Sequence, residues 1–489
     1  TQDMSANDCF KPISKYWDRI NRPEQLISSM LEAMRVLTSP SETGAVTIAL
    51  PHDVQAETYE FPDEFFQKRI WNIPRLIPDR FLISKATDAI RKSKRPMIIS
   101  GGGVIYSEAE KELKKFIEKT GIPVAETFAG KGSLHYKHEL NLGAMGATGT
   151  KGANEISKDA DLVIGIGTRY GDFTSASKSA WQNPNVTFIN INITELDAYK
   201  QSAIPLQGDA KEILKIISKE LDGFSTDVRY INKIKSLNEE WDKIVEKAYS
   251  PLDFDKPVQA EILGALNTFI DDNDVVVCAA GSAPGDLHKL WRTKSSKGFH
   301  LEYGNSCMGY EIPGGLGVKM ADKSREVYVI CGDASYLMLP SDIITTIQEG
   351  YKIIIILINN EGYASIGGLS ESVGGGGFGT HFKYRNPKTG QLDGDFLPVD
   401  LAKNAESLGA IVYKPKGIKE YNESLSKAKK NDRTTVIYME TIRDRKMSGY
   451  GYSWWEVPVP EISESTKVQK VREQYEIDKK SQKKYIKPS

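Results

Sequence analysis

Short apolar stretches alternate with longer amphipathic ones over most of the chain. The short stretches are runs of β-branched and aliphatic residues bounded by Gly, Pro or charged residues, a pattern typical of buried strands in a parallel sheet. The longer stretches carry apolar residues at helical spacing. Strands that alternate with helices favour parallel, doubly wound sheets. We therefore predict an α/β fold built from doubly wound parallel sheets.

The individual elements follow from the same patterns. Helices are predicted at 24–37, 83–93, 107–119, 258–269 and 341–349, and strands at 44–50, 96–99, 161–166, 186–193, 274–279, 326–331, 353–358 and 434–440.

The order of these elements divides the chain into two α/β units, a connector and two flanking segments. The connector is polar and rich in Lys and Glu, and the C-terminal segment is charged and expected to be peripheral. The predicted divisions are an N-terminal segment with a linker (1–78), a first α/β unit (79–225), a helical connector (226–256), a second α/β unit (257–445) and a C-terminal tail (446–489).

The composition excludes several classes of protein. The chain of 489 residues is 40% hydrophobic and 26% charged with a net charge of −1, so it lacks the basic excess typical of nucleic-acid binding. Its longest apolar run, 353–358, is far shorter than a membrane span. The polar start at 1–4 does not resemble a signal peptide. The 4 cysteines are scattered, without a CxxC pair, which favours a reducing, cytoplasmic setting over a zinc site or a disulfide scaffold.

The strongest chemical pattern lies at the ends of two predicted strands. Gly332 and Asp333 follow one strand, and Asn360 follows the next strand along the chain. Carboxyl ends of neighbouring parallel strands meet at the edge where open α/β sheets bind ligands. A carboxylate, an amide oxygen and the carbonyl of Gly362 are ligands that Mg²⁺ accepts beside phosphate oxygens. Gly-Asp and Asn-Asn are each common at strand ends and turns, but together at this spacing they predict a magnesium diphosphate site.

This pair of motifs resembles the signature of thiamine-diphosphate-dependent enzymes of the acetolactate-synthase type. The resemblance implies that Asp333, Asn360 and the Gly362 carbonyl bind Mg²⁺. It also implies that Met308, within the Gly-rich segment 304–315, props the cofactor in a bent conformation while the Ser306 carbonyl accepts a hydrogen bond from it. The cofactor-binding residues implied in this way are Gly281, Ser282, Ser306, Met308, Gly332, Asp333, Ala334, Ser335, Asn360, Gly362 and Tyr363.

The same resemblance makes the first α/β unit the Rossmann-like central domain of a thiamine-diphosphate-binding fold. Residues 101–103 (Gly-Gly-Gly) could suggest a dinucleotide site, but Tyr106 stands where the last glycine of the fingerprint would be, so no flavin is expected. The glycine run 374–377 is expected to be a mobile loop over the site.

Further runs resemble the branch of this family that opens a cyclic dione in inositol breakdown. This implies cleavage of 3D-(3,5/4)-trihydroxycyclohexane-1,2-dione to 5-deoxyglucuronate, a hydrolysis of a C–C bond. His288, Arg292 and Glu311 are candidates to contact the substrate hydroxyls, although structural roles are the simpler expectation. His52 departs from the branch pattern. The matching runs are 16–20, 22–26, 50–57, 167–170, 192–200, 285–292, 362–367 and 392–395.

The family also carries an N-terminal pyrimidine-binding domain whose glutamate protonates N1′ of the cofactor. Residues 1–75 resemble only the end of that domain, so we expect this glutamate to lie outside the chain and assign no catalytic residue. The family forms its site between subunits, which implies a homodimer or homotetramer. Two alternatives stay open: an acetolactate-synthase-like carboligase or decarboxylase, and a truncated chain that binds the cofactor without turnover.

Overall fold

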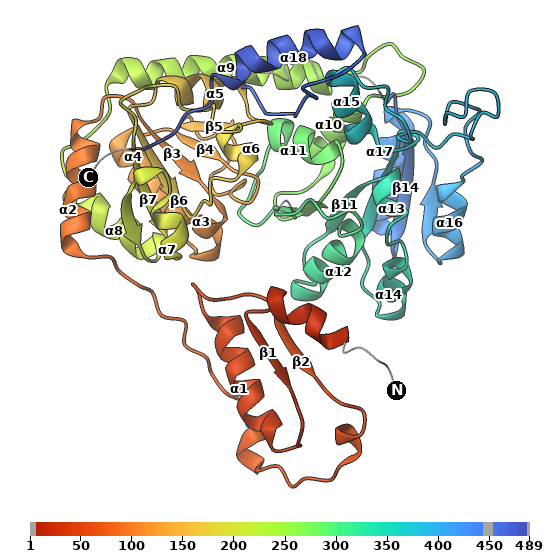
Figure 1. Cartoon of the computed structure of the whole chain (residues 1–489), viewed down its shortest axis with the longest axis horizontal. Coiled ribbons are helices and arrows are strands. Elements are labelled where there is room, and N and C mark those ends of the chain that lie inside the picture. The colour runs from red at the N-terminus through yellow and green to blue at the C-terminus, as the bar shows by residue number, and fades with distance from the viewer. Residues whose placement is uncertain (1–5, 303, 444–452, 487–489) are drawn as a thin grey trace.

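The computed structural model describes residues 6–302, 304–443 and 453–486, so the N-terminus at 1–4 and residues 446–452 of the predicted tail lie outside the described part. Figure 1 shows two α/β units side by side and a small N-terminal lobe set apart from them. Each unit contains one six-stranded sheet in which all pairings are parallel. The predicted α/β fold with parallel sheets is therefore confirmed.

The N-terminal lobe is a helix packed on a two-stranded parallel sheet. The predicted helix and strand are both present, and the linker that follows crosses to the first α/β unit (Figure 1). The elements of the lobe and linker are η1 (Ala6–Ile13), β1 (Tyr16–Arg19), α1 (Gln25–Thr38), β2 (Val46–Ala49), η2 (Val54–Ala56) and η3 (Asp63–Phe66).

The first α/β unit has the strand order β5-β4-β3-β6-β7-β8. Its predicted strands are confirmed as β3, β6 and β7, which are almost fully buried. The strands are β3 (Pro96–Ser100), β4 (Val124–Glu126), β5 (Asn141–Ala144), β6 (Leu162–Ile166), β7 (Thr187–Asn192) and β8 (Ile204–Gln207).

Helices cover this sheet, and α4 and α8 pack against each other. The expected helix 107–119 is present but begins later, at Glu110, and the glycine run 101–103 leads into a separate short helix that ends at Tyr106. The helices are α2 (Arg80–Lys92), α3 (Gly102–Tyr106), α4 (Glu110–Thr120), α5 (Lys151–Asp159), α6 (Asp172–Ser175), α7 (Glu195–Ala198), η4 (Lys200–Ser202) and α8 (Ala210–Glu220).

The second unit has the strand order β10-β9-β11-β12-β14-β13. The chain leaves β9 toward β10 and then returns to β11 on its other side, which makes the gap between β9 and β11 a topological switch point. The strands are β9 (Val275–Cys278), β10 (Phe299–Leu301), β11 (Val327–Gly332), β12 (Ile354–Asn359), β13 (Ile411–Tyr413) and β14 (Thr435–Glu440).

Alternate residues of β12 enter two different hydrophobic cores. Ile354, Ile356 and Ile358 belong to one core with residues of α10 and α17, whereas Ile355 and Leu357 belong to another with residues of α12, α14 and α16. This sheet is therefore buried on both faces, as an uninterrupted apolar strand requires. The helices are α10 (Gln259–Phe269), α11 (Ala283–Leu290), α12 (Glu311–Ala321), α13 (Asp333–Tyr336), α14 (Asp342–Gln348), α15 (Ala364–Ser372), α16 (Leu401–Ser407) and α17 (Ile418–Lys430).

The connector and the described part of the tail hold the two units together. The connector forms α9 (Val228–Tyr249), which contacts α5 of the first unit and α10 of the second. The tail contains α18 (Thr466–Lys479) and was expected to be peripheral, but it packs on both units. The Trp455 indole donates to the Asp172 carboxylate at 2.6 Å, and Val468 shares a hydrophobic cluster with Val373. An aromatic residue of the tail, Trp455, contributes to this packing, which the charged composition of the tail did not indicate.

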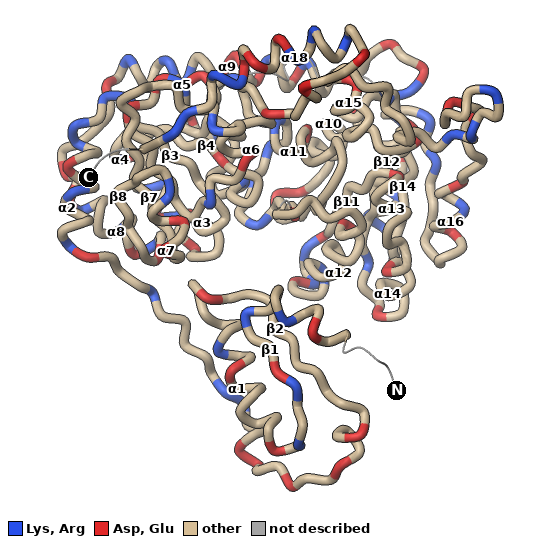
Figure 2. The backbone as a smooth tube through the Cα atoms, viewed as in Figure 1, with Lys and Arg blue, Asp and Glu red and all other residues tan. Residues whose placement is uncertain are grey.

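Charged side chains are dispersed over the molecule. Figure 2 shows Lys and Arg interspersed with Asp and Glu along both α/β units, as the net charge of −1 suggests. Within the described ranges, none of the helices combines the length and the apolar character that crossing a bilayer demands.

Replacing Trp181 tests the packing between the tail and the first unit. The Trp181 side chain is fully buried, and its ring lies 5.9 Å from the ring of Tyr485 in the tail. Trp181→Ala leaves a large cavity and should lower the free energy of unfolding by about 3–5 kcal/mol in urea titrations followed by circular dichroism. Tyr106→Ala is the control, because 87% of Tyr106 is exposed. Equal stability of both variants would contradict the packing described.

Candidate active site

Two neighbouring strands of the second sheet end together at its carboxyl edge. In the register of β11 and β12, Gly332 lies opposite Ile358, so Asp333 comes one residue and Asn360 two residues beyond this last pair. The sequence prediction that these two residues lie at one edge is confirmed by this register. The edge also contains the end of β9, across the switch point, where ligands bind in open α/β sheets.

The Asp333 carboxylate is buried and holds the loop after β12. Its Oδ2 accepts hydrogen bonds from the backbone N–H of Asn360 at 3.1 Å and of Gly362 at 2.9 Å. Its Oδ1 accepts from the N–H of Ala334 at 2.7 Å. Burial raises the pKa of this carboxyl group, and the hydrogen bonds from Gly362, Ala334 and Asn360 oppose that rise. Asp333 thus brings together three of the residues that the sequence predicted.

The side-chain oxygen of Asn360 has no hydrogen-bond partner within the described part of the chain. Its Oδ1 is buried, and no described group donates a hydrogen bond to it. An unsatisfied buried acceptor is costly, so a cation or donor at this position would be favourable. Asn360 also contacts the Asp333 carboxylate through its backbone N–H, so the two residues are neighbours at the site. The residues present therefore fit a divalent cation of the oxygen-binding type.

Gly362 occupies a backbone position that no other residue would tolerate. Its φ is +141°, and a Cβ atom built there would lie 2.3 Å from the Thr380 carbonyl oxygen. The Arg443 guanidinium fixes the same contact by donating to that carbonyl at 2.9 Å and to the Tyr363 carbonyl at 3.5 Å. Arg443, which sequence reasoning missed, thus supports the loop that contains Gly362 and Tyr363.

No cluster of three or more His, Cys, Asp and Glu side chains suited to a metal occurs in the part of the chain described. A Mg²⁺ site built with a diphosphate does not need one, because the ion usually takes one or two carboxylates and completes its shell with phosphate and water oxygens.

The strand tips leave open space where a cofactor would lie. Gly281 follows β9 with φ +95°, and Gly332 ends β11. A Cβ atom added to either glycine would meet no atom of another segment within 4 Å. Ser282 begins α11, and its hydroxyl donates to the Gln259 side chain at 2.9 Å. Because β9 pairs with β11 in parallel, the predicted residues after β9 lie at the same edge of the sheet as the tip of β11.

The predicted segment around Met308 forms a loop that is held by hydrogen bonds of the Gly309 N–H. Ser306 has φ +52°, a left-handed conformation that explains why glycine suits this position. Met308 is 37% exposed, so it is not a core residue. The Gly309 N–H donates to the Ser335 hydroxyl at 3.0 Å, which joins this loop to the turn after β11.

Glu311, a candidate for substrate contact, lies in buried hydrogen bonds, in line with the simpler, structural expectation. It is fully buried at the start of α12, where its carboxylate accepts from the Ala280 N–H at 3.0 Å, the Gly309 N–H at 3.1 Å and the Ser335 hydroxyl at 2.7 Å. Burial raises the pKa of this group, and those same donors oppose the rise. Glu311 thus holds Ala280, Gly309 and Ser335, which lie in or next to the predicted cofactor-binding segments.

The other two substrate candidates lie in structural contacts. His288 is buried between the two units, where its Nδ1 lies 2.8 Å from the Thr148 hydroxyl and its ring stacks on Phe128 with centroids 3.9 Å apart. Burial keeps the pKa of His288 well below its usual value. Arg292 forms ion pairs with Asp242 at 3.2 Å and Glu246 at 2.5 Å, both on α9. Both residues thus make the kind of structural contacts that were the simpler expectation for them.

The glycine runs 101–103 and 374–377 both contain glycines that lie close to other segments. A Cβ at Gly101 would lie 2.3 Å from the Gly167 carbonyl oxygen, so this turn needs glycine because two backbone segments touch. In the run 374–377, expected to be a mobile loop, Gly374 lies against Val468 of α18, and the Gly377 N–H donates to the Ser370 hydroxyl at 3.2 Å.

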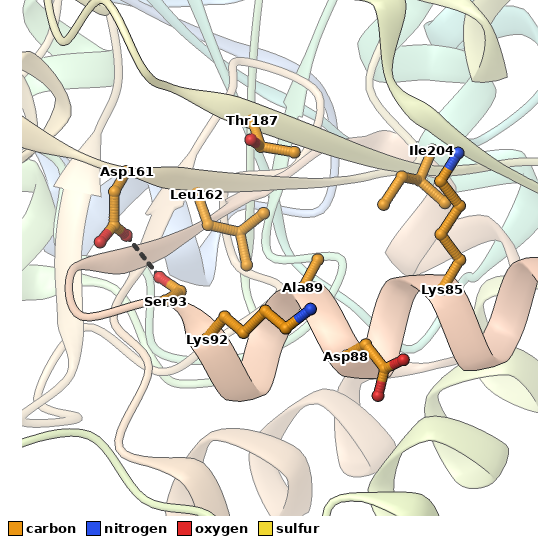
Figure 3. A pocket seen from close by; sticks show the side chains of 9 residues that line it. All are labelled: Lys85, Asp88, Ala89, Lys92, Ser93, Asp161, Leu162, Thr187 and Ile204. Carbon is orange, nitrogen blue, oxygen red and sulfur yellow. Dashed lines mark hydrogen bonds between the residues drawn. The ribbon is translucent and has the colours of Figure 1, made fainter. Parts of the chain in front are cut away.

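A cavity of about 420 Å³ lies elsewhere, at the amino ends of β6, β7 and β8 (Figure 3). The Ser93 hydroxyl donates to the Asp161 carboxylate there, and the same carboxylate accepts from the Lys94 N–H at 2.8 Å. This edge is opposite to the one where parallel sheets bind ligands, so it does not belong to the candidate site.

Comparison with known families identifies both α/β units. Residues 83–217 match the thiamine pyrophosphate enzyme, central domain, and residues 279–439 match the thiamine pyrophosphate enzyme, C-terminal TPP binding domain. The candidate site described above therefore lies within the second of these matches.

Similar proteins extend the match over almost the whole chain. A 3D-(3,5/4)-trihydroxycyclohexane-1,2-dione hydrolase of Clostridium tetani (strain Massachusetts / E88) is 46% identical, over 96% of this chain and 77% of that protein. A protein of the same name from Bacillus thuringiensis (strain Al Hakam) is 43% identical, over 95% of this chain and 76% of its own length. The chain belongs to the thiamine pyrophosphate enzyme family and, within it, to the family of the 3D-(3,5/4)-trihydroxycyclohexane-1,2-dione hydrolases.

Proposed function

We propose that this protein uses thiamine diphosphate and Mg²⁺ to cleave 3D-(3,5/4)-trihydroxycyclohexane-1,2-dione hydrolytically to 5-deoxyglucuronate, a step of inositol breakdown. The observation that carries the cofactor site is the buried amide oxygen of Asn360, which no described group contacts by a hydrogen bond and whose backbone N–H contacts the Asp333 carboxylate. The names of the relatives support the substrate and favour this hydrolysis over the carboligase alternative. Thiamine diphosphate, when bound, supplies the nucleophile and the electron sink.

The roles of the chain's own residues follow from their positions. Asp333, Asn360 and the Gly362 carbonyl would bind Mg²⁺ at the tips of β11 and β12. Met308 and the Ser306 carbonyl would orient the organic part of the cofactor, since both lie in the loop that precedes α12. The residues that would line the diphosphate and its surroundings are Gly281, Ser282, Gly332, Ala334, Ser335 and Tyr363.

We further propose that the protein works in the cytoplasm as a homodimer or homotetramer. All 4 cysteines are free, which supports a reducing compartment. Apolar side chains stand exposed next to the candidate site: Gly309 is close to Met338 and Leu339, which are 49% and 41% exposed. Exposed apolar groups beside a site support a contact with another subunit there.

Removal of the Asp333 carboxylate tests the cofactor site. Asp333→Ala deletes a metal ligand and the acceptor that orders the loop after β12, so the affinity for thiamine diphosphate in the presence of Mg²⁺ should fall at least about a hundredfold by calorimetry. Asp322→Ala, which removes an exposed carboxylate at the end of α12, should bind normally. Unchanged affinity of Asp333→Ala would refute the assignment.

Turnover tests the substrate. A form of the protein that includes the pyrimidine-binding domain and its glutamate, supplied with thiamine diphosphate and Mg²⁺, should convert the cyclic dione to the ring-opened acid, observed by NMR spectroscopy, and should leave pyruvate unchanged in a parallel reaction. Consumption of pyruvate without cleavage of the dione would instead favour the acetolactate-synthase-like alternative.

A further inference from the structure

One buried carboxylate connects three segments that the proposed function assigns to the cofactor. Glu311 contacts the loop after β9 through Ala280, the loop before α12 through Gly309, and the turn after β11 through Ser335. These segments come from separate parts of the chain. Within the described residues, each of them therefore owes part of its position to the same side chain.

Each oxygen of Glu311 faces a backbone N–H, and Oε1 also accepts from the Ser335 hydroxyl. Oε1 accepts from the Ala280 N–H, and Oε2 accepts from the Gly309 N–H. A backbone N–H cannot accept a hydrogen bond, so the side chain must present an acceptor at both ends. A glutamine has the same shape, but either orientation of its amide would direct an NH₂ group at one of these N–H groups. The geometry thus requires a carboxyl group and not merely a polar side chain.

Stability alone does not account for this carboxylate. Glu311 is fully buried, and no Lys, Arg or His among the described residues forms an ion pair with it. Other acidic groups of this sheet do have such partners: Lys352 lies 2.8 Å from Glu326, and Lys429 lies 3.7 Å from Asp274. Burying an unpaired carboxyl group costs free energy that its hydrogen bonds only partly offset. A requirement of the site explains its presence better.

We propose that Glu311 is a positioning residue that sets the spacing of the three segments around the diphosphate, and so determines the affinity for it. This inference rests on the proposed function, because the segments are assigned to the cofactor there. Glu311 acts through Ala280, Gly309 and Ser335. Its exchange should therefore affect any ligand that carries the diphosphate group, with or without the thiamine part.

The test is the binding of two ligands to Glu311→Gln, an isosteric change. Calorimetry at a temperature far below unfolding measures dissociation constants for thiamine diphosphate and for inorganic pyrophosphate, each with Mg²⁺. Both constants should rise about tenfold or more relative to the unchanged protein, because either the Ala280 N–H loses its acceptor or an NH₂ group is directed at the Gly309 N–H, which then keeps only the Ser335 hydroxyl. Asp274→Asn is the matched control, a buried carboxylate at the opposite edge of the same sheet.

The possible outcomes separate this inference from the proposed function. If the unchanged protein binds neither ligand, the proposed cofactor site fails and this inference fails with it. If the unchanged protein binds and Glu311→Gln shows a lower unfolding temperature with normal dissociation constants, the residue has only a structural role and the inference is overturned. Weaker binding confined to Glu311→Gln, with Asp274→Asn normal, supports it.

A second variant applies if Glu311→Gln does not yield folded protein by circular dichroism. Glu311→Asp keeps the carboxyl group but is one methylene shorter, so it cannot reach the N–H groups of Ala280 and Gly309 together. Its dissociation constant for pyrophosphate with Mg²⁺ should rise at least about threefold, for the same loss of a buried acceptor. An unchanged constant in this variant would also overturn the inference.

Discussion

The hydrogen bonds from the backbone N–H groups of Asn360 and Gly362 to the Asp333 carboxylate define the candidate site. They exist because β11 and β12 are neighbours in one parallel sheet and end at the same edge. The carboxylate holds the loop after β12, in which the Asn360 amide oxygen is buried without a hydrogen-bond partner among the described residues. The loop after β9 and the loop before α12 lie beside this pair of strand tips and are held there by Glu311.

Much of this arrangement was predictable from sequence, because it depends on local patterns. A strand buried on both faces is a continuous apolar run, so 353–358 was recognised as the strand that is now β12. The residue after such a strand is at a sheet edge wherever the strand pairs, so Asp333 and Asn360 could be placed at that edge from their positions in the chain alone. The long amphipathic helices α1, α9 and α10 were predicted for the same local reason.

The features that were missed depend on contacts between distant segments. The three-residue strands β4, β10 and β13 carry too few residues for a periodic pattern and are strands only because neighbours pair with them. The charged tail gave no sign that Trp455 would anchor it to the first unit. Glu311 could be singled out as a polar residue near the site, but its partners come from β9 and β11, and sequence spacing does not reveal which segments those strands bring together.

The two α/β units use the same edge of their sheets in different ways. In the first unit, the turns after β3 and β6 touch through Gly101 and Gly167, so glycine is required there because two backbones meet. In the second unit, Gly281 and Gly332 stand at the corresponding strand ends with open space beside them. A glycine after a strand can thus close an edge or leave it open, and the residue type does not distinguish the two. The distinction comes from the neighbouring turn, because the turn at Gly101 meets the Gly167 backbone whereas no other described segment comes within 4 Å of a Cβ atom at Gly281 or Gly332.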